Sequence, residues 1–239
     1  MYTEEFKLAK ELAKEVGSFL LKQESKHIDS LEGKDIKLKL DKEAEKKIIE
    51  SLQSKFDYSI LSEEVGLIGQ IDQSKPYWII DPIDGTMNYS RNCPIACVSI
   101  ALWSNDQPIL GVVYDFFRDE LFSGLVGKGA WLNNNEIQPS EIKERNQAIL
   151  ATGFPTYLDL NDKTLTAFFD HVKDYKKIRM FGSAALSLCY VACGRVDSYK
   201  EDKIKLWDIA AGLAINVAAH MTYNLKNQEN YSTNLSVGV

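Results

Sequence analysis

The run from Trp78 to Thr86 constrains this chain more than any other stretch. It reads Trp-Ile-Ile-Asp-Pro-Ile-Asp-Gly-Thr, so an apolar strand ends in two carboxylates that are followed at once by a glycine and a threonine. A strand end of this kind can offer oxygen ligands to a hard cation and backbone N–H groups to a phosphate. Taken alone, the run is equally compatible with a strand that ends in an Asp-Gly turn.

Composition indicates a soluble globular protein. The chain has 239 residues, of which 45% are hydrophobic and 26% are charged, and its formal net charge is −6. That length suits one large domain or two halves that share a core. We expect two halves that form one catalytic unit, residues 1–145 with Glu63, Asp81 and Asp84, and residues 146–239 with Asp208.

The charge and the hydropathy pattern exclude several partners. A net negative charge argues against nucleic acid as the main partner, since nucleic-acid binding usually needs a basic face. No stretch approaches the roughly 18 apolar residues of a membrane span. The acidic start, Glu4-Glu5, is unlike a signal peptide. We therefore expect a cytoplasmic protein without a membrane partner.

Cysteine and histidine usage points away from zinc, disulfides and histidine catalysis. Two cysteine pairs, each spaced by four residues, are Cys93/Cys97 and Cys189/Cys193. That spacing is not a zinc motif and predicts reduced, mostly buried thiols. The three histidines stand in no recognisable Ser-His or Cys-His arrangement. A hydrolase of this composition would use carboxylates and metal ions to activate water.

Hydrophobic periodicity predicts alternating helices and strands. Apolar spacing of three and four residues predicts a series of helices over Thr3–Gln23, Asp41–Ser54, Asn161–Asp174, Ala184–Cys193 and Trp207–Ala219. Asp41 would be the N-cap of the second helix. Residues from His27 to Lys39 would form a loop and a short hairpin. The rest of the pattern predicts strands over Tyr58–Leu61, Tyr77–Ile80, Ala96–Trp103, Pro108–Phe116, Leu121–Ser123, Ala130–Leu132, Ala148–Thr152, Lys177–Met180 and Val196–Tyr199. Helices that flank two sheets form a layered α/β sandwich.

Two other acidic segments accompany the central motif. Ser-Glu-Glu-Val-Gly begins at Ser62, and Leu-Trp-Asp-Ile-Ala-Ala-Gly begins at Leu206. Each has an ordinary structural explanation, because Glu63-Glu64 is typical of a solvated loop and Asp208 of a helix N-cap beside a core tryptophan. In this order and combination, however, the three segments resemble the inositol monophosphatase family of magnesium-dependent, lithium-sensitive phosphatases. The resemblance runs from the first predicted helix to Gly212.

The resemblance implies an α-β-α-β-α sandwich with two or three Mg²⁺ ions between its halves. Glu63, Asp81 and the carbonyl of Ile83 would hold one ion, and Asp81, Asp84 and Asp208 a second. Glu64 would lie next to these ligands and hold them in position without binding an ion itself. Thr86 would accept a hydrogen bond from the attacking water and donate one to Asp41, so that the pair orients and deprotonates that water. The family commonly has a threonine three residues before this aspartate, where the present chain has Leu38.

Substrate contacts are implied by further matches. Gly85 and Thr86 would open a short helix whose N–H groups face the phosphate. The run from Gly182 through Ser183 to Ala184 resembles the loop that meets a polyol, and Ser183 is also a good helix N-cap. Glu201 stands where relatives have a glutamate that binds ring hydroxyls, or it is a surface charge. The segment from Ala151 to Pro155 resembles the strand end beside the substrate in bacterial members.

The chain departs from the family after the Trp-Asp helix. Where relatives continue with Glu-Ala-Gly-Gly and a strand pair, this sequence has Val-Ala-Ala-His from Val217 and then a polar tail. We expect shortened final strands and altered packing around Asp208.

The sequence supports three functions. The first is a Mg²⁺-dependent phosphomonoesterase that acts on a small polyol phosphate such as inositol 1-phosphate, and the resemblance implies that it is a homodimer. The second is another phosphatase of the superfamily, for example a 3′(2′),5′-bisphosphate nucleotidase or a sugar-phosphate phosphatase. Nucleotidases usually have Lys-Glu-Phe after Gly-Thr, whereas here Met87-Asn88-Tyr89 follows. The third is a regulatory binding protein that keeps the fold without the activity.

Overall fold

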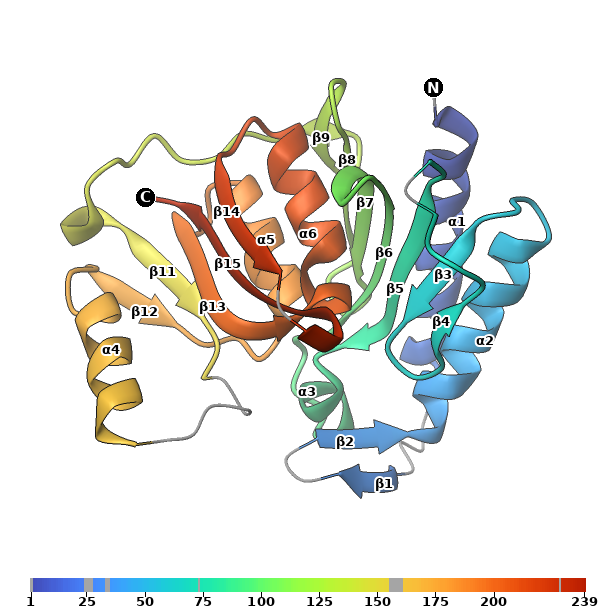
Figure 1. Ribbon diagram of the computed structural model, residues 1–239, viewed down its shortest axis with the longest axis horizontal. Helices are drawn as coiled ribbons and strands as arrows, with labels where there is room; N and C mark the ends of the chain where they lie inside the picture. The colour runs from blue at the N-terminus through green and yellow to red at the C-terminus, as the bar shows by residue number, and fades with distance from the viewer. Residues whose placement is uncertain (1, 24–27, 33–34, 73, 155–160, 228) are drawn as a thin grey trace.

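Two β-sheets and three helical layers alternate through the molecule (Figure 1). The computed structural model describes residues 2–23, 28–32, 35–72, 74–154, 161–227 and 229–239. A sheet of eight strands has the order β10-β9-β8-β7-β6-β5-β3-β4. In chain order its strands are β3 (Ser59–Ser62), β4 (Gly66–Ile68), β5 (Tyr77–Asp84), β6 (Cys97–Ser104), β7 (Gln107–Asp115), β8 (Glu120–Leu125), β9 (Gly129–Leu132) and β10 (Asn135–Glu136).

The second sheet has five strands in the order β12-β11-β13-β15-β14. They are β11 (Ile149–Thr152), β12 (Lys177–Arg179), β13 (Ser198–Lys205), β14 (Tyr223–Asn227) and β15 (Ser232–Gly238). A separate hairpin, β1 (Ile28–Glu32) and β2 (Asp35–Leu38), lies below the eight-stranded sheet in Figure 1. The structure also has two short 3₁₀ turns, η1 (Arg145–Gln147) and η2 (Glu229–Tyr231).

Helices cover the outer face of the larger sheet and fill the space between the two sheets. α1 (Thr3–Leu21) and α2 (Lys39–Gln53) pack on the outer face, whereas α5 (Ala184–Ala192) and α6 (Leu206–Ala218) lie between the sheets. α4 (Asp162–Val172) lies beyond the smaller sheet, and α3 (Thr86–Ser90) is a single short turn after β5. This is the layered sandwich that the sequence predicts.

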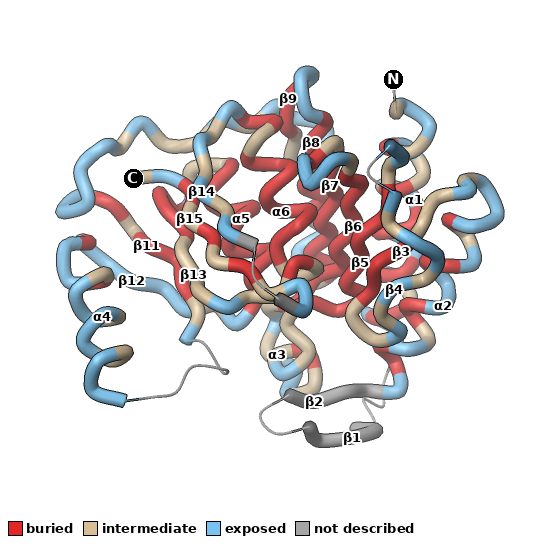
Figure 2. The backbone as a smooth tube through the Cα atoms, viewed as in Figure 1, coloured by how far each residue is buried: buried red, intermediate tan, exposed pale blue. Residues whose placement is uncertain are grey.

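Burial follows the layers. Buried residues concentrate in β5, β6, β7, α5 and α6, whereas α4 and β12 are largely exposed (Figure 2). All eight residues of β5 are buried, because helices cover both faces of the sheet at that point. Its alternate side chains enter two cores. Trp78 and Ile80 pack toward α1 and α2, and Tyr77 and Ile79 pack toward α5 and α6.

Small residues let α6 approach the larger sheet closely. A Cβ atom built on Gly111 of β7 would lie 2.1 Å from the carbonyl oxygen of Ala211, and one on Gly124 of β8 would lie 2.7 Å from the Cα of Ile215. The Trp103 indole of β6 donates a hydrogen bond of 3.2 Å to the carbonyl of Ala210. The backbone of α6 therefore rests directly on the sheet.

Three details differ from the sequence predictions. α2 begins at Lys39, so Asp41 lies inside its first turn and is not the N-cap. β5 continues to Asp84, because a register shift between Asp81 and Asp84 accommodates Pro82 within the strand. The polar tail forms β14 and β15, with Leu235 and Val237 buried against the inner core.

Other expectations are confirmed or untested. The four cysteines are free, and Cys97 and Cys189 are buried. Among the described residues, none of the helices combines the length and apolar character needed to span a membrane. His27, Gly33 and Pro155 lie outside the described residues.

Candidate metal and phosphate site

Acidic side chains from several elements meet between the two sheets. They come from the first turn of α2, the turn after β3, the end of β5, the middle of β13 and the first turn of α6, and are Asp41, Glu63, Asp81, Asp84, Glu201 and Asp208. Their mutual influence shows their proximity. Charged groups from at least two other elements act on each of Glu63, Asp81 and Asp208, although these residues lie far apart in the sequence.

Burial and like charges disfavour the ionised forms of these groups. Burial raises the pKa of Asp81 well above its ordinary value, and the charges of Glu63, Asp84 and Asp208 raise it further. Burial likewise raises the pKa of Glu63 to about 8, although a hydrogen bond with Asp81 lowers it and the charge of Asp41 raises it. Such a cluster must take up either protons or cations at neutral pH.

Asp84 connects the larger sheet to the start of α5. Its Oδ2 atom accepts hydrogen bonds from the Ser183 hydroxyl and, at 2.8 Å, from the Ala185 N–H at the start of α5. The Ala184 N–H also donates to this carboxylate. Ser183 is at the same time the N-cap of α5, because its Oγ accepts from the Leu186 N–H at 3.2 Å. The structural role predicted for Ser183 is thus confirmed, and its hydroxyl also fixes Asp84.

Asp208 lies in the first turn of α6. It follows the N-cap residue Lys205 by three positions and accepts a hydrogen bond of 3.3 Å from the Lys205 N–H. Asp208 is therefore not itself the N-cap. Burial raises the pKa of its carboxyl well above the ordinary value, and the charges of Glu63 and Asp84 add to that effect. The helix start holds this carboxylate toward the end of β5.

The Gly-Thr pair forms a tight turn after β5. Gly85 has φ +91°, and a Cβ atom at this position would lie 2.7 Å from the carbonyl oxygen of Ile95. α3 begins at Thr86, as the sequence predicts. The Thr86 hydroxyl donates a hydrogen bond of 2.8 Å to the carbonyl of Ile83, whereas the resemblance implies Asp41 as its acceptor. Asp41 is buried, with 2% of its surface exposed.

Glu201 is built into the site and is not a surface charge. Its carboxylate accepts a hydrogen bond of 2.8 Å from the Tyr199 hydroxyl and another from the Gly153 N–H. Burial raises its pKa to about 7, and the charge of Asp84 contributes. A Cβ atom on Gly153 would lie 2.3 Å from either oxygen of Glu201. β11 ends at Thr152, so the residue that follows the strand, Gly153, is the one that contacts Glu201.

Two residues with roles at the site escape the sequence analysis. Glu45 of α2 is buried, and its Oε1 atom accepts from the Ser62 hydroxyl, the Glu64 N–H at 3.1 Å and the Val65 N–H at 3.2 Å. It therefore fixes the turn that carries Glu63. Its position four residues after Asp41, on the face of Ala44 and Ile48, is the signal that could have found it.

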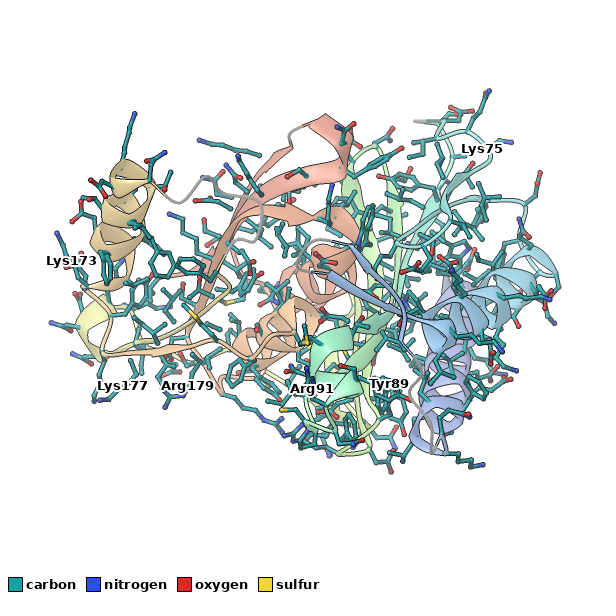
Figure 3. All side chains as sticks on the ribbon, turned by 90° about the horizontal axis from the view of Figure 1, so that it is seen from below. Lys75, Tyr89, Arg91, Lys173, Lys177 and Arg179 are labelled. Carbon is teal, nitrogen blue, oxygen red and sulfur yellow. The ribbon has the colours of Figure 1, made fainter. Side chains whose placement is uncertain are left out.

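Asn88 similarly fixes the loop that precedes α5. Its side-chain amide donates to the carbonyls of Ile95 at 2.9 Å, Phe181 at 2.8 Å and Gly182 at 3.3 Å. α3 is thereby attached to the segment that precedes α5. The next residue, Tyr89, anchors α3 on its other side, because its hydroxyl donates to the Leu20 carbonyl at 2.7 Å. Figure 3 shows Tyr89 and Arg91 at the lower centre of the molecule.

The donor set fits a hard divalent cation. It consists of carboxylate and carbonyl oxygens, which Mg²⁺ prefers, and it lacks cysteine and histidine ligands. Within the described part of the chain, no three acidic, histidine or cysteine side chains already form a ready-made cage. The carboxylates instead bond to protein groups such as Ser183 and the Lys205 N–H. Binding of a cation would draw their oxygens together and relieve the repulsion that raises their pKa values.

Comparisons with known proteins agree with this geometry. The model of the inositol monophosphatase family matches residues 1–223. The Nus factor SuhB of Xylella fastidiosa is 41% identical over 209 residues, which cover 85% of this chain and 75% of that protein. The inositol-1-monophosphatase of Synechocystis sp. is 41% identical over 187 residues, which cover 76% of this chain and 63% of that protein.

A solved structure shares the whole architecture. The crystal structure of the extragenic suppressor protein SuhB from Bartonella henselae matches with a TM-score of 0.88 and 30% sequence identity. The match covers 99% of this chain and 94% of that one, so the two sheets and their helices correspond throughout. The chain therefore belongs to the inositol monophosphatase family.

Proposed function

We propose that this protein is a Mg²⁺-dependent phosphomonoesterase that hydrolyses a small polyol phosphate, with inositol 1-phosphate as the best candidate. The observation that carries the proposal is the meeting of Glu63, Asp81, Asp84 and Asp208 beside the Gly85–Thr86 turn. Family membership supports phosphatase chemistry, and the name of the Synechocystis relative supports the substrate.

The residues divide into ion ligands and water-orienting groups. Glu63, Asp81 and the Ile83 carbonyl would hold one ion, and Asp81, Asp84 and Asp208 another. When bound, Mg²⁺ would neutralise the phosphoryl oxygens and lower the pKa of a water molecule. Thr86 and Asp41 would orient the attacking water. That role requires the Thr86 hydroxyl to exchange its Ile83 acceptor for Asp41.

The substrate would lie between the phosphate turn and β13. The N–H groups after Gly85 would face the phosphate, and the loop from Gly182 to Ala184 would contact the alcohol part. Glu201 would accept hydrogen bonds from the polyol hydroxyls. Its environment suits that task, because Tyr199 and the Gly153 backbone hold the carboxylate in one place.

A regulatory role is a second candidate, because the relative from Xylella fastidiosa is called a Nus factor. Such a role could use the fold without turnover, or coexist with it. Other phosphate esters, including bisphosphate nucleotides and sugar bisphosphates, would use the same ligand set. These alternatives differ in which substrate is hydrolysed and whether any hydrolysis needs the metal.

Phosphate release tests these candidates directly. We would compare inositol 1-phosphate, adenosine 3′,5′-bisphosphate and fructose 1,6-bisphosphate, each with Mg²⁺ and with EDTA. Mg²⁺-dependent release from inositol 1-phosphate, inhibited by lithium, is the expected result. Preference for another ester would keep the mechanism and change the substrate. Absence of release from all three would refute the proposed activity and favour the regulatory candidate.

A further inference from the structure

A cavity lies on the opposite side of the five-stranded sheet from Glu201. Its volume is about 290 Å³, and it opens between η1, the end of α4 and the outer face of β13, β14 and β15. None of the acidic residues of the candidate site lines it. Its polar lining includes Arg145, His171, Lys200, Asp202, Asn224 and Lys226.

Strand register brings polar side chains from three strands to this face. Lys200 of β13 pairs with Ser236 of β15, and Ser236 pairs in turn with Asn224 of β14. One row further, Asn234 of β15 pairs with Lys226 of β14. Side chains alternate along a strand, so the residues between them face the other way. Tyr199, Leu235 and Val237 are accordingly buried in the core between the sheets.

The cavity concentrates positive charge. Arg145, Lys200 and Lys226 line it, against the Asp202 side chain and the α-carboxylate of the last residue, Val239, among its described lining residues. None of the four charged side chains forms an ion pair within the described part of the chain. Two of the other arginines are paired, since Arg195 binds Glu120 at 2.6 Å and Arg118 binds Asp115 at 2.9 Å. The guanidinium of Arg145 instead lies over the Tyr175 ring, 5.5 Å from its centroid.

His171 adds a polar group that lacks a protein partner. Its Nε2 atom is buried and accepts or donates no hydrogen bond within the described residues. Burial lowers the pKa of this imidazole, and the charges of Lys200 and Arg145 lower it further. These influences show that His171, Lys200 and Arg145 lie close together. A merely solvated polar sheet face would not need a histidine and an arginine to enclose it from α4 and η1.

We propose that this cavity binds a small ligand through a phosphate group. The volume suits a compact ligand, since pockets for larger molecules span about 300 to 1,000 Å³. Three cations that form no ion pair outnumber the two carboxylates of the lining, and lysine and arginine are the side chains that bind phosphate most strongly. The Tyr175 and Ser198 hydroxyls already donate to the carboxylate of Val239, so Arg145, Lys200, Lys226 and His171 would make the main contacts.

Calorimetric titration of the metal-free protein tests this site separately from the acidic one. EDTA leaves the carboxylate cluster without cations, so that cluster repels phosphate. Inorganic phosphate and glycerol 3-phosphate would be titrated at constant ionic strength, with chloride as the reference. The expected result is one bound phosphate per chain, and the ratio of the two affinities identifies free phosphate or an ester as the better ligand.

Variants locate the bound phosphate. Arg145→Gln and Lys200→Gln should each weaken binding about tenfold or more, because each removes a charge-assisted hydrogen bond. Lys177→Gln is the matched control, since Lys177 is exposed on β12 outside the cavity (Figure 3) and should leave the affinity unchanged. Thermal unfolding without phosphate checks that each variant folds. Titration heats equal to those of chloride, or equal affinity in all three variants, would overturn the proposal.

Discussion

Asp84 combines a structural and a chemical task in one side chain. Its Oδ2 atom is committed to the start of α5 through Ser183 and Ala185, so the carboxylate is oriented before any cation arrives. Preorganised ligands of this kind lower the cost of assembling a metal site. The arrangement also explains why a buried acid persists between two sheets, where burial raises its pKa.

Asp84→Asn separates these two tasks. The amide oxygen can still accept from the α5 N–H groups, so the unfolding temperature should stay within a few degrees of that of the unaltered protein. Loss of the negative charge should lower kcat for phosphate release by about 10³-fold or more. Steady-state kinetics and calorimetry measure the two effects. Near-normal turnover by a folded variant would remove Asp84 from the proposed ligand set.

Gly153→Ala probes the substrate side of the site. The added methyl group would lie 2.3 Å from the carboxylate of Glu201, so that carboxylate must move. We expect KM for inositol 1-phosphate to rise several-fold with a smaller change in kcat, because Glu201 is proposed to bind hydroxyls and not the phosphate. Glu201→Gln should show the same pattern. A fall in kcat at constant KM in both variants would contradict the assignment.

At the scale of elements, α2 positions the turn that follows β3. Glu45 accepts three hydrogen bonds from that turn, and Asp41 lies one helical turn earlier on the same face. One helix therefore positions both Asp41, the aspartate proposed to orient water, and the loop of Glu63. The backbone N–H groups of Glu64 and Val65 have a charged acceptor at this point, which makes the turn rigid.

Glu45→Gln should loosen this turn. An amide accepts more weakly than a carboxylate, so Glu63 would be held less firmly and the Mg²⁺ concentration for half-maximal activity should rise about tenfold. Turnover at saturating Mg²⁺ should change less. Glu43→Gln, on the exposed side of the same helix, is the matched control and should have no effect. Equal metal dependence of the two variants would show that Glu45 has only a structural role.

The sequence predicts most elements because their periodicity is strong. α1, α5 and α6 are found within a few residues of the expected bounds, and the carboxylate motifs point to one site. The sequence does not predict the start of α2, because Lys39 and Leu40 carry no capping signal, and it predicts the last strands, β14 and β15, only in shortened form, because their outward residues are polar. Glu45 was missed since a glutamate within a helix ordinarily faces solvent. The division of the chain near residue 145 stays a prediction.

The whole molecule stores electrostatic repulsion between its two sheets. Carboxyl groups from both halves of the chain meet there, and burial raises the pKa values of Glu63, Asp81, Asp84 and Asp208. In the absence of metal, the folded state holds protons that the unfolded chain releases. Folding, metal binding and pH are therefore linked.

The metal-free protein should lose stability as pH rises. The pKa of Glu63 is about 8 in the folded state against an ordinary 4.5, so its contribution is fully present below about pH 4.5 and is lost as pH approaches 8. Mg²⁺ should offset this loss by binding the ionised groups. Unfolding temperatures in EDTA and in Mg²⁺ should thus diverge between about pH 5 and pH 8. The linkage would be contradicted if the difference between the unfolding temperatures in EDTA and in Mg²⁺ stayed constant with pH. It would also be contradicted if Glu63→Gln left the pH dependence of that difference unaltered.

The close approach of α6 to the larger sheet has a genetic consequence. Asp208 is carried by the first turn of α6, while Gly111 and Gly124 meet the backbone of that helix further along. A methyl group at either glycine would shift the helix and, with it, the carboxylate at its start. A random-mutagenesis search for folded but inactive alleles should therefore return these glycines, although neither one would touch a cation or a substrate.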